Sequence, residues 1–131
     1  RRIARQLAET IAQLPTAPDW RAFLTGLVRA NVEMRMTAPG GVGLGASLLA
    51  IGELVPIVEA GFEVDAQLIA LALEQRVPAR SFAEWLPIIR VAMAVTRQLL
   101  DDRFSRPRLD EEHLRLVILM IESYLANFIP D

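Results

Sequence analysis

The last helical segment of the chain is apolar on more than one side, and this limits the folds open to it. A helix that packs once against a core needs one apolar stripe roughly 100° wide. Here that stripe consists of Leu114, Val117, Ile121, Tyr124 and Phe128. Further apolar side chains lie outside it, namely Leu116, Ile118, Leu119, Met120 and Leu125. Such a helix must be covered on two faces, and for a chain of 131 residues a second copy of the chain is the simpler cover.

The rest of the chain has the same helical periodicity. Apolar residues recur at helical spacing wherever a period can be read, and no stretch alternates as a strand requires. Hydrophobic residues make up 53% of the sequence, which is enough for the core of one domain. We therefore predict an all-α domain of about six helices over residues 1–131.

A proline and a capping sequence separate the first two helices. The first helix is expected to end near Pro15. The next residues, Thr16-Ala17-Pro18-Asp19, have the form of a capping box, with Thr16 as the N-cap and Asp19 reaching back from the third position. A second helix is then predicted to run to about Thr37.

Glycines and a proline interrupt the middle of the chain. Residues 39–45 are rich in glycine, but they follow a helix and the chain has no lysine, so they do not match a phosphate-binding loop. We interpret them as a flexible connection that can gate a pocket. The apolar stretch 46–60 is interrupted by Pro56, and Gly61 predicts its end. A further helix is expected over about residues 63–76.

A second capping box opens the longest predicted helix. Ser81-Phe82-Ala83-Glu84 has the capping pattern, and the helix continues to about Arg103 with Pro87 inside it. Its polar stripe is narrow, so this helix also needs cover on two faces. Asp110 is the predicted N-cap of the final helix.

The charges and the missing residue types exclude several functions. The chain has 14 basic residues, all arginine, and 16 acidic residues. The formal net charge of −2 leaves no positive field for DNA or an anionic membrane. Without lysine or cysteine, and with His113 as the one histidine, the chain has no Schiff-base lysine, thiol nucleophile or multi-histidine metal site. His113 is predicted to lie at the surface. We expect neither an enzyme nor a bound cofactor.

The sequence also predicts a cytoplasmic protein that does not enter a membrane. No signal peptide is visible, and the longest apolar run, residues 116–121, is far shorter than the roughly 20 residues that span a bilayer. Helical spacing of apolar residues begins directly after Arg1, so we expect further residues upstream.

One polar residue on an apolar face indicates a ligand contact. Asn31 shares a helix face with Trp20, Phe23, Leu27 and Met34, and a buried amide without a partner costs about 1–3 kcal/mol. No basic residue accompanies Asn31 on this face, so charged metabolites are disfavoured and a mostly hydrophobic small molecule is expected. The alternative is that these aromatic and methionine side chains form an ordinary core.

The order of these features resembles a known protein family. Asp19-Trp20-Arg21, with Leu24, opens a helix that ends before Pro39-Gly40. Glu59-Ala60-Gly61-Phe62 precedes another helix, and the last helix closes on Tyr124-Leu125. This order resembles the C-terminal effector-binding and dimerisation domain of the bacterial tetracycline-repressor-like (TetR/AcrR) transcriptional regulators.

The resemblance implies a helix-turn-helix head outside this chain, with residues 1–14 as the linking helix. DNA would then be bound only through that head. It also implies a homodimer in which the last two long helices and their copies form a four-helix bundle. The expected interface residues are Ile89, Met93, Leu100, Val117, Met120, Ile121 and Tyr124.

The resemblance further implies a ligand pocket among the middle helices. The candidate residues are Trp20, Phe23, Leu27, Asn31, Met34, Phe62, Trp85 and Met93. A small molecule bound there would control the DNA affinity of the head. The alternative is a helical homodimer for protein interaction or scaffolding without a pocket, and a third hypothesis is a cofactor-free helical enzyme. An enclosed apolar cavity would favour the regulator.

Overall fold

The computed structural model describes residues 2–37, 55–104 and 111–130, and in this part of the chain every regular element is a helix. The elements are α1 (Arg2–Ile11), the 3-10 turn η1 (Leu14–Thr16), α2 (Trp20–Thr37), α4 (Val55–Arg76), α5 (Phe82–Phe104) and α6 (Glu111–Leu125). The prediction of an all-α fold is confirmed. The glycine-rich connection, most of the apolar stretch 46–60 and the predicted cap Asp110 lie outside the described residues.

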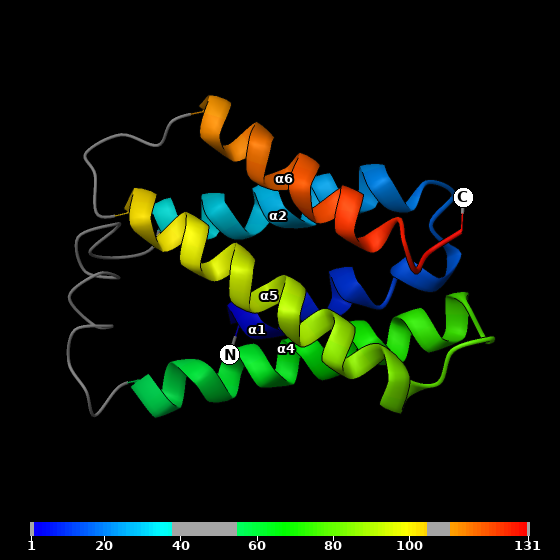
Figure 1. Ribbon diagram of the computed structural model, residues 1–131. Coiled ribbons are helices and arrows are strands. Elements are labelled where there is room, and N and C mark those ends of the chain that lie inside the picture. The colour runs from blue at the N-terminus through cyan, green and yellow to red at the C-terminus, as the bar shows by residue number, and fades with distance from the viewer. Residues whose placement is uncertain (1, 38–54, 105–110, 131) are drawn as a thin grey trace.

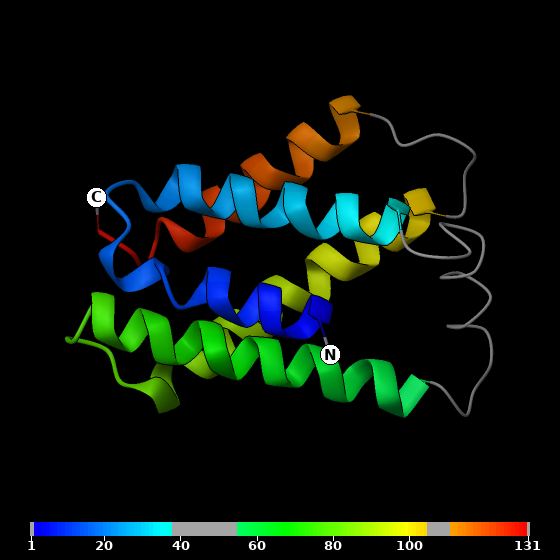
Figure 2. The same cartoon turned by 180° about the vertical axis from the view of Figure 1, so that it is seen from behind.

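The helices form two layers with the core between them. One layer consists of α5 and α6, and the other of α2, α1 and α4, with α1 between the other two (Figure 1, Figure 2). Across the layers α4 packs against α5, and α2 packs against α6. Trp85 and Leu73 are among the most deeply buried side chains of this core. None of the described helices is long and apolar enough to cross a membrane.

The start of α5 is the reciprocal capping box that the sequence predicts. The hydroxyl of Ser81 accepts a hydrogen bond from the Glu84 backbone N–H at 3.3 Å, and the Glu84 carboxylate accepts one from the Ser81 N–H at 3.0 Å. Both bonds satisfy donors that a helix start otherwise leaves unpaired. They also lower the pKa of the Glu84 carboxyl, because its charged form accepts them.

The predicted capping box before α2 is wrong. Thr16 belongs to the turn η1, and its hydroxyl donates to the Gln13 carbonyl oxygen instead of capping a helix. Asp19 is the cap: its carboxylate oxygen accepts hydrogen bonds from the backbone N–H groups of Arg21, at 3.0 Å, and Ala22, at 3.3 Å. The helix therefore begins directly after Asp19 because its side chain, shorter than that of glutamate, reaches these donors from the N-cap position.

The helix break predicted at Gly61 is also wrong, since α4 runs unbroken from Val55 to Arg76. Pro56 lies in the first turn, where its missing N–H removes no intrahelical hydrogen bond. Gly61 costs a helix about 1 kcal/mol relative to alanine, which is too little to end a helix held by packing. A single glycine was therefore not enough to predict the end of a helix.

Side-chain hydrogen bonds join helices that are distant in the sequence. At the end of α4, the Arg76 guanidinium donates to the carbonyl oxygens of Leu14 and Ala17 in the connection between α1 and α2. Between α2 and α6, the Thr25 hydroxyl donates to the Glu122 carboxylate at 3.2 Å. The Arg76 bonds lie within one layer, and the Thr25 bond joins the two layers.

Candidate functional site

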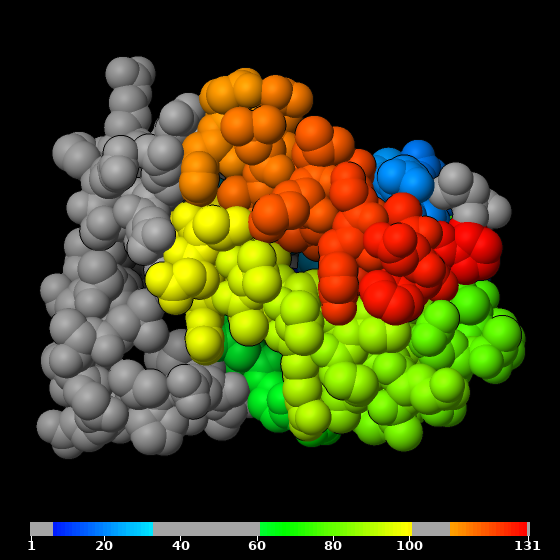
Figure 3. Space-filling model, viewed as in Figure 1, coloured from blue at the N-terminus to red at the C-terminus, as the bar shows by residue number. Residues whose placement is uncertain are grey.

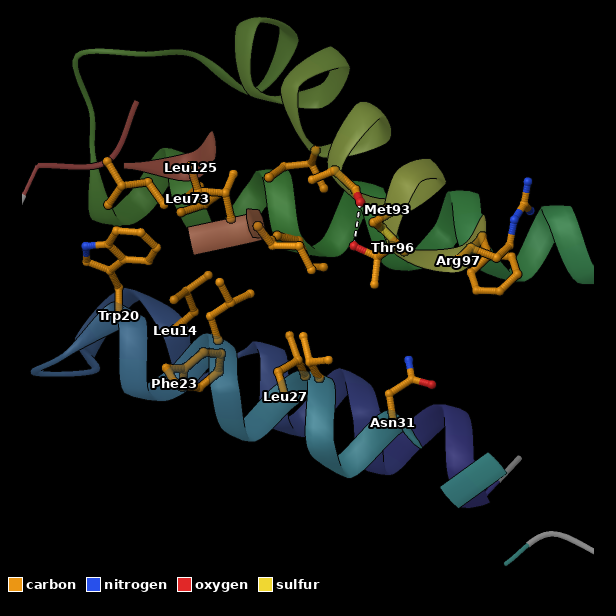
Figure 4. Close-up of a pocket in the computed structure, with 18 of the residues that line it drawn as sticks. Leu14, Trp20, Phe23, Leu27, Asn31, Leu73, Met93, Thr96, Arg97 and Leu125 are labelled. Carbon is orange, nitrogen blue, oxygen red and sulfur yellow. Dashed lines mark hydrogen bonds between the residues drawn. The ribbon is translucent and has the colours of Figure 1, made fainter. Parts of the chain in front are cut away.

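An apolar cavity of about 140 Å³ lies between the two layers. Side chains from α2, α4, α5 and α6 form its wall together with Leu14 and Ile129 (Figure 4). The α2 side is lined by Trp20, Phe23, Leu24, Leu27, Val28 and Asn31. The other helices contribute Phe62, Ile69, Leu73, Ile89, Ala92, Met93, Thr96, Arg97, Leu100, Ile121 and Leu125.

The cavity has an apolar end and a polar end. Leu14, Leu73 and Leu125 lie with Trp20 at one end (Figure 4). Asn31, Thr96 and Arg97 lie toward the other end, on the two helices that face each other across the space (Figure 4). A ligand in this cavity is therefore offered polar partners at one end only.

The polar groups differ in how they are already paired. The Thr96 hydroxyl donates to the Ala92 carbonyl oxygen at 2.6 Å, so its proton is used within the helix. Asn31 is partly buried, and its amide forms no hydrogen bond with a residue that the structure describes. The indole N–H of Trp20 is buried without a partner, but it points away from Leu27 and Asn31 (Figure 4). Asn31 is therefore the amide available to orient a ligand.

Most of the predicted pocket residues line this cavity, namely Trp20, Phe23, Leu27, Asn31, Phe62 and Met93. The side chain of Met34 lies outside the described part of the chain. Trp85 does not line the cavity, so its assignment to the pocket is corrected.

Trp85 is a core residue in the first turn of α5, one turn before the cavity-lining Ile89. It is 0% exposed, and the guanidinium carbon of Arg80 lies 5.3 Å from the centroid of its ring. The same guanidinium carbon lies 5.2 Å from the ring of Phe128, so the cation is held between two aromatic rings. Its aromatic character in the sequence did not distinguish this packing role from a pocket role.

More residues of α5 line the cavity than were predicted from the sequence. Ile89, Thr96, Arg97 and Leu100 are three or four residues from Met93, or one further turn along the same helix face. Helical spacing from Met93 would have found them. Nothing in the sequence pattern indicated which of the two apolar sides of α5 faces the cavity.

A basic residue lines the cavity from a helix other than that of Asn31. Asn31 has no basic neighbour on its own face, but α5 brings Arg97 to the wall of the same cavity. The guanidinium carbon of Arg97 lies 4.9 Å from the centroid of the Phe62 ring. The lack of a basic residue on the Asn31 face of α2 therefore does not exclude a charged ligand group at this site.

A second hollow, of about 230 Å³, shares Phe62, Met93 and Arg97 with the cavity. Glu63 and Arg90 line it as an ion pair with a 2.9 Å hydrogen bond from the Arg90 Nε to a carboxylate oxygen. Hydrogen bonds from Arg90 and then from Gln67 lower the pKa of Glu63 to about 2. Arg90 is therefore neutralised by Glu63.

The structure corrects the predicted dimer-interface residues. Ile89, Leu100, Val117 and Ile121 are buried in the core of their own chain, and all but Val117 line the cavity. Met93 is partly buried and also lines the cavity. These residues face inward, so they are not available to a second copy.

Tyr124 and Met120 have opposite places on α6. The Tyr124 hydroxyl donates to the Ile88 carbonyl oxygen at 3.1 Å and so holds α6 to α5 within one chain. Met120 is 43% exposed and is the member of the predicted set that lies on the outer surface. The predicted set therefore took only inward-facing residues from α5 and mixed the two apolar faces of α6.

The outer face of this layer carries large exposed hydrophobic side chains. They are Val91 and Val95 on α5, with Leu116, Leu119 and Met120 on α6. The two helices pack against each other and together cover the front of the molecule, with a small hollow between them (Figure 3). We call these five residues the outer apolar set. A second apolar face on both helices agrees with the pattern in the sequence.

The described residues contain no group of histidine, cysteine, aspartate or glutamate side chains that could hold a metal ion. The ring nitrogen Nε2 of His113 lies 3.0 Å from the Leu99 carbonyl oxygen. His113 is partly buried and joins α6 to α5, so the prediction of a simple surface residue is corrected.

Comparisons with known proteins place the chain in no family. No protein-family description, no curated protein and no solved structure matches it.

Proposed function

We propose that this chain is the effector-binding and dimerisation domain of a TetR-like transcriptional regulator. A mostly hydrophobic small molecule bound in the cavity would control the DNA affinity of a helix-turn-helix head outside these 131 residues. The observation that carries the proposal is the cavity itself, because one ligand in it would contact α2, α4, α5 and α6 together. Small-molecule sites have this character, with apolar walls and few placed polar groups.

The cavity volume sets the scale of the ligand. An apolar cavity of about 150 Å³ in another protein holds one benzene molecule. The present 140 Å³ therefore suits one ring or a short aliphatic chain as the buried part of the ligand. A larger ligand would have to move α5 or α6 away from α2.

The same two helices connect the cavity to the proposed dimer interface. Met93 and Ile121 line the cavity from the inner faces of α5 and α6, whereas Val95 and Met120 belong to the outer apolar set. A ligand that favours one arrangement of these helices would also change how two copies meet. The second copy would cover the apolar area that a single chain leaves in water.

The opposite wall connects the cavity to α1. Phe62, Ile69 and Leu73 line the cavity from α4, and α4 packs against α1. In the proposed regulator α1 is the helix that leads to the DNA-binding head. A shift of α4 on ligand binding would therefore be passed to that head.

The outer apolar set also supports the second candidate function, a homodimeric interaction or scaffold domain. That function needs the dimer but no ligand. The cavity favours the regulator, because a scaffold core gains stability from being filled.

Two measurements test the proposal. In a thermal-shift screen of uncharged one-ring compounds, a ligand at 100 times its dissociation constant should add roughly 2.7 kcal/mol of stability. Asn31→Leu should weaken ligands that carry a hydrogen-bonding group, while Gln67→Leu, at an exposed α4 position outside the cavity, should not. A longer protein with the upstream residues should bind DNA in a ligand-dependent way, and residues 1–131 alone should not. No ligand and no DNA binding would favour the scaffold.

A further inference from the structure

Arg97 stands apart from the other charged groups near the cavity. Its guanidinium lies against the Phe62 ring and forms no ion pair with a residue that the structure describes. In contrast, Arg90 in the neighbouring hollow is paired with Glu63. Glu63, the acidic residue that lines this hollow, is thus already paired, and Arg97 lies where the two hollows meet without an ion-pair partner among the described residues.

The guanidinium of Arg97 lies over the Phe62 ring and forms no hydrogen bond with a residue that the structure describes. Its N–H donors are therefore available to a ligand. The contact of 4.9 Å also limits the motion of a long side chain before any ligand arrives. A planar carboxylate matches this fork with two parallel hydrogen bonds.

The rest of the cavity fits the apolar part of such a molecule. Leu14, Leu73 and Leu125 surround the far end with Trp20, whereas Arg97 and Asn31 lie at the other end (Figure 4). A molecule with an apolar body and one anionic head can place each part against matching groups in a single orientation. Arg97 is partly buried, so its head group would keep some contact with water.

From this arrangement we infer that the cavity's ligand is an amphipathic monocarboxylate, with its apolar body between α2 and α5 and its carboxylate on the guanidinium of Arg97. Asn31 lines the same end of the cavity from α2, across from α5 (Figure 4). The inference rests on the proposed ligand-binding function and names the chemical class of its ligand.

The test is a calorimetric titration of the full chain with two probes of the same shape. The probes are 3-phenylpropanoate, which is ionised near pH 7, and its uncharged counterpart 3-phenylpropan-1-ol. Charge-assisted hydrogen bonds to a partly exposed arginine predict that Arg97→Gln weakens the carboxylate about tenfold. The same substitution should leave the alcohol within about twofold, because the alcohol has no charge for Arg97 to bind.

Two further variants separate charge from packing. Arg97→Lys keeps the charge but loses the planar fork, so it should retain part of the carboxylate affinity. Arg115→Gln removes an exposed arginine paired with Glu112 on α6, away from the cavity, and should change neither affinity. Circular dichroism of each variant checks that the helices remain formed.

The outcomes distinguish the inference from the function on which it rests. If both probes lose affinity equally in Arg97→Gln, or if the carboxylate loses none, Arg97 is not an anion site although the cavity still binds ligands. If the alcohol alone binds the wild-type chain, the anionic class is wrong. If neither probe binds, both the inference and the proposed use of the cavity are contradicted.

Discussion

The hydroxyl of Tyr124 donates a 3.1 Å hydrogen bond to the carbonyl oxygen of Ile88, the residue that follows Pro87 in α5. The bond crosses from α6 to α5 and lies among partly buried groups. Tyr124 also meets the Phe128 ring edge to face, with the centroids 5.4 Å apart. The tyrosine therefore holds the two helices of one layer together at the end opposite to His113 and Leu99.

Removing this hydroxyl tests its role in the layer. Tyr124→Phe keeps the ring and its packing but deletes the hydrogen bond, so the free energy of unfolding should fall by about 1 kcal/mol. Urea unfolding followed by circular dichroism measures the change. Unaltered stability would show that water replaces the hydroxyl without loss.

Replacing either of the two described helical glycines by alanine should stabilise the fold. A Cβ added at Gly26 or Gly61 meets no atom within 4 Å, and both positions are exposed. Gly26→Ala and Gly61→Ala should therefore each raise the free energy of unfolding by roughly 0.5–1 kcal/mol, because alanine loses less backbone entropy in a helix. Loss of stability in Gly61→Ala would mean that the unbroken course of α4 is misjudged.

Replacing Asp65 by asparagine should raise the stability of the chain in a pH-dependent way. Burial raises the pKa of this half-buried carboxyl above its ordinary value, since the charged form is poorly solvated. The folded state therefore prefers the protonated form, and its penalty grows as pH rises from the ordinary pKa through the raised one. Asp65→Asn should stabilise the chain near pH 7 and lose this advantage near pH 3, as urea unfolding at both values would measure.

Glu63 on the same helix provides the opposite case. Its pKa is lowered to about 2, so the stabilisation from Arg90 and Gln67 is present above the ordinary value and is lost as pH falls toward the lowered one. Glu63→Gln should accordingly reduce stability near pH 7. If Asp65→Asn and Glu63→Gln changed the stability near pH 7 in the same direction, burial and pairing would not affect the two carboxylates in opposite ways.

The outer apolar set predicts which substitutions separate a dimer. Met120→Asp places a charge in the proposed interface and should cost several kcal/mol of association, leaving a folded monomer. Leu71→Asp makes the same change at an exposed apolar residue of α4 and should remain dimeric. Sedimentation velocity at micromolar concentration compares them. A wild-type monomer, or a dimer in both variants, would show that this surface is not the interface.

Local sequence signals predicted the fold where one interaction decides the outcome. The capping box at Ser81 and Glu84 could be read because both partners are close in sequence and each satisfies the other. The equivalent prediction at Thr16 failed because Asp19 alone can cap α2, and the spacing did not show which residue is the cap. The helix end predicted at Gly61 was wrong because packing outweighs the small penalty of glycine in a helix.

The site was predictable along one helix but not across helices. The face of α2 from Trp20 to Asn31 follows from helical periodicity, and it does line the cavity. Arg97 could not be assigned to the cavity, because α5 has two apolar sides and only its packing against α4 and α6 decides which one faces inward. The same ambiguity on α6 mixed Met120 with the buried Val117 and Ile121 in the predicted interface.

The most direct test of the central claim is a calorimetric titration of 3-phenylpropan-1-ol into the wild-type chain and into two alanine variants. Ala92 lines the cavity, so Ala92→Leu should fill part of its 140 Å³ and abolish binding without unfolding the protein. Ala83→Leu adds the same atoms at an exposed position of α5 and should bind like the wild type. Binding to the wild type and to Ala83→Leu, but not to Ala92→Leu, is the predicted result. Equal binding by all three, or binding of neither the alcohol nor 3-phenylpropanoate by the wild type, would contradict a ligand site between these helices.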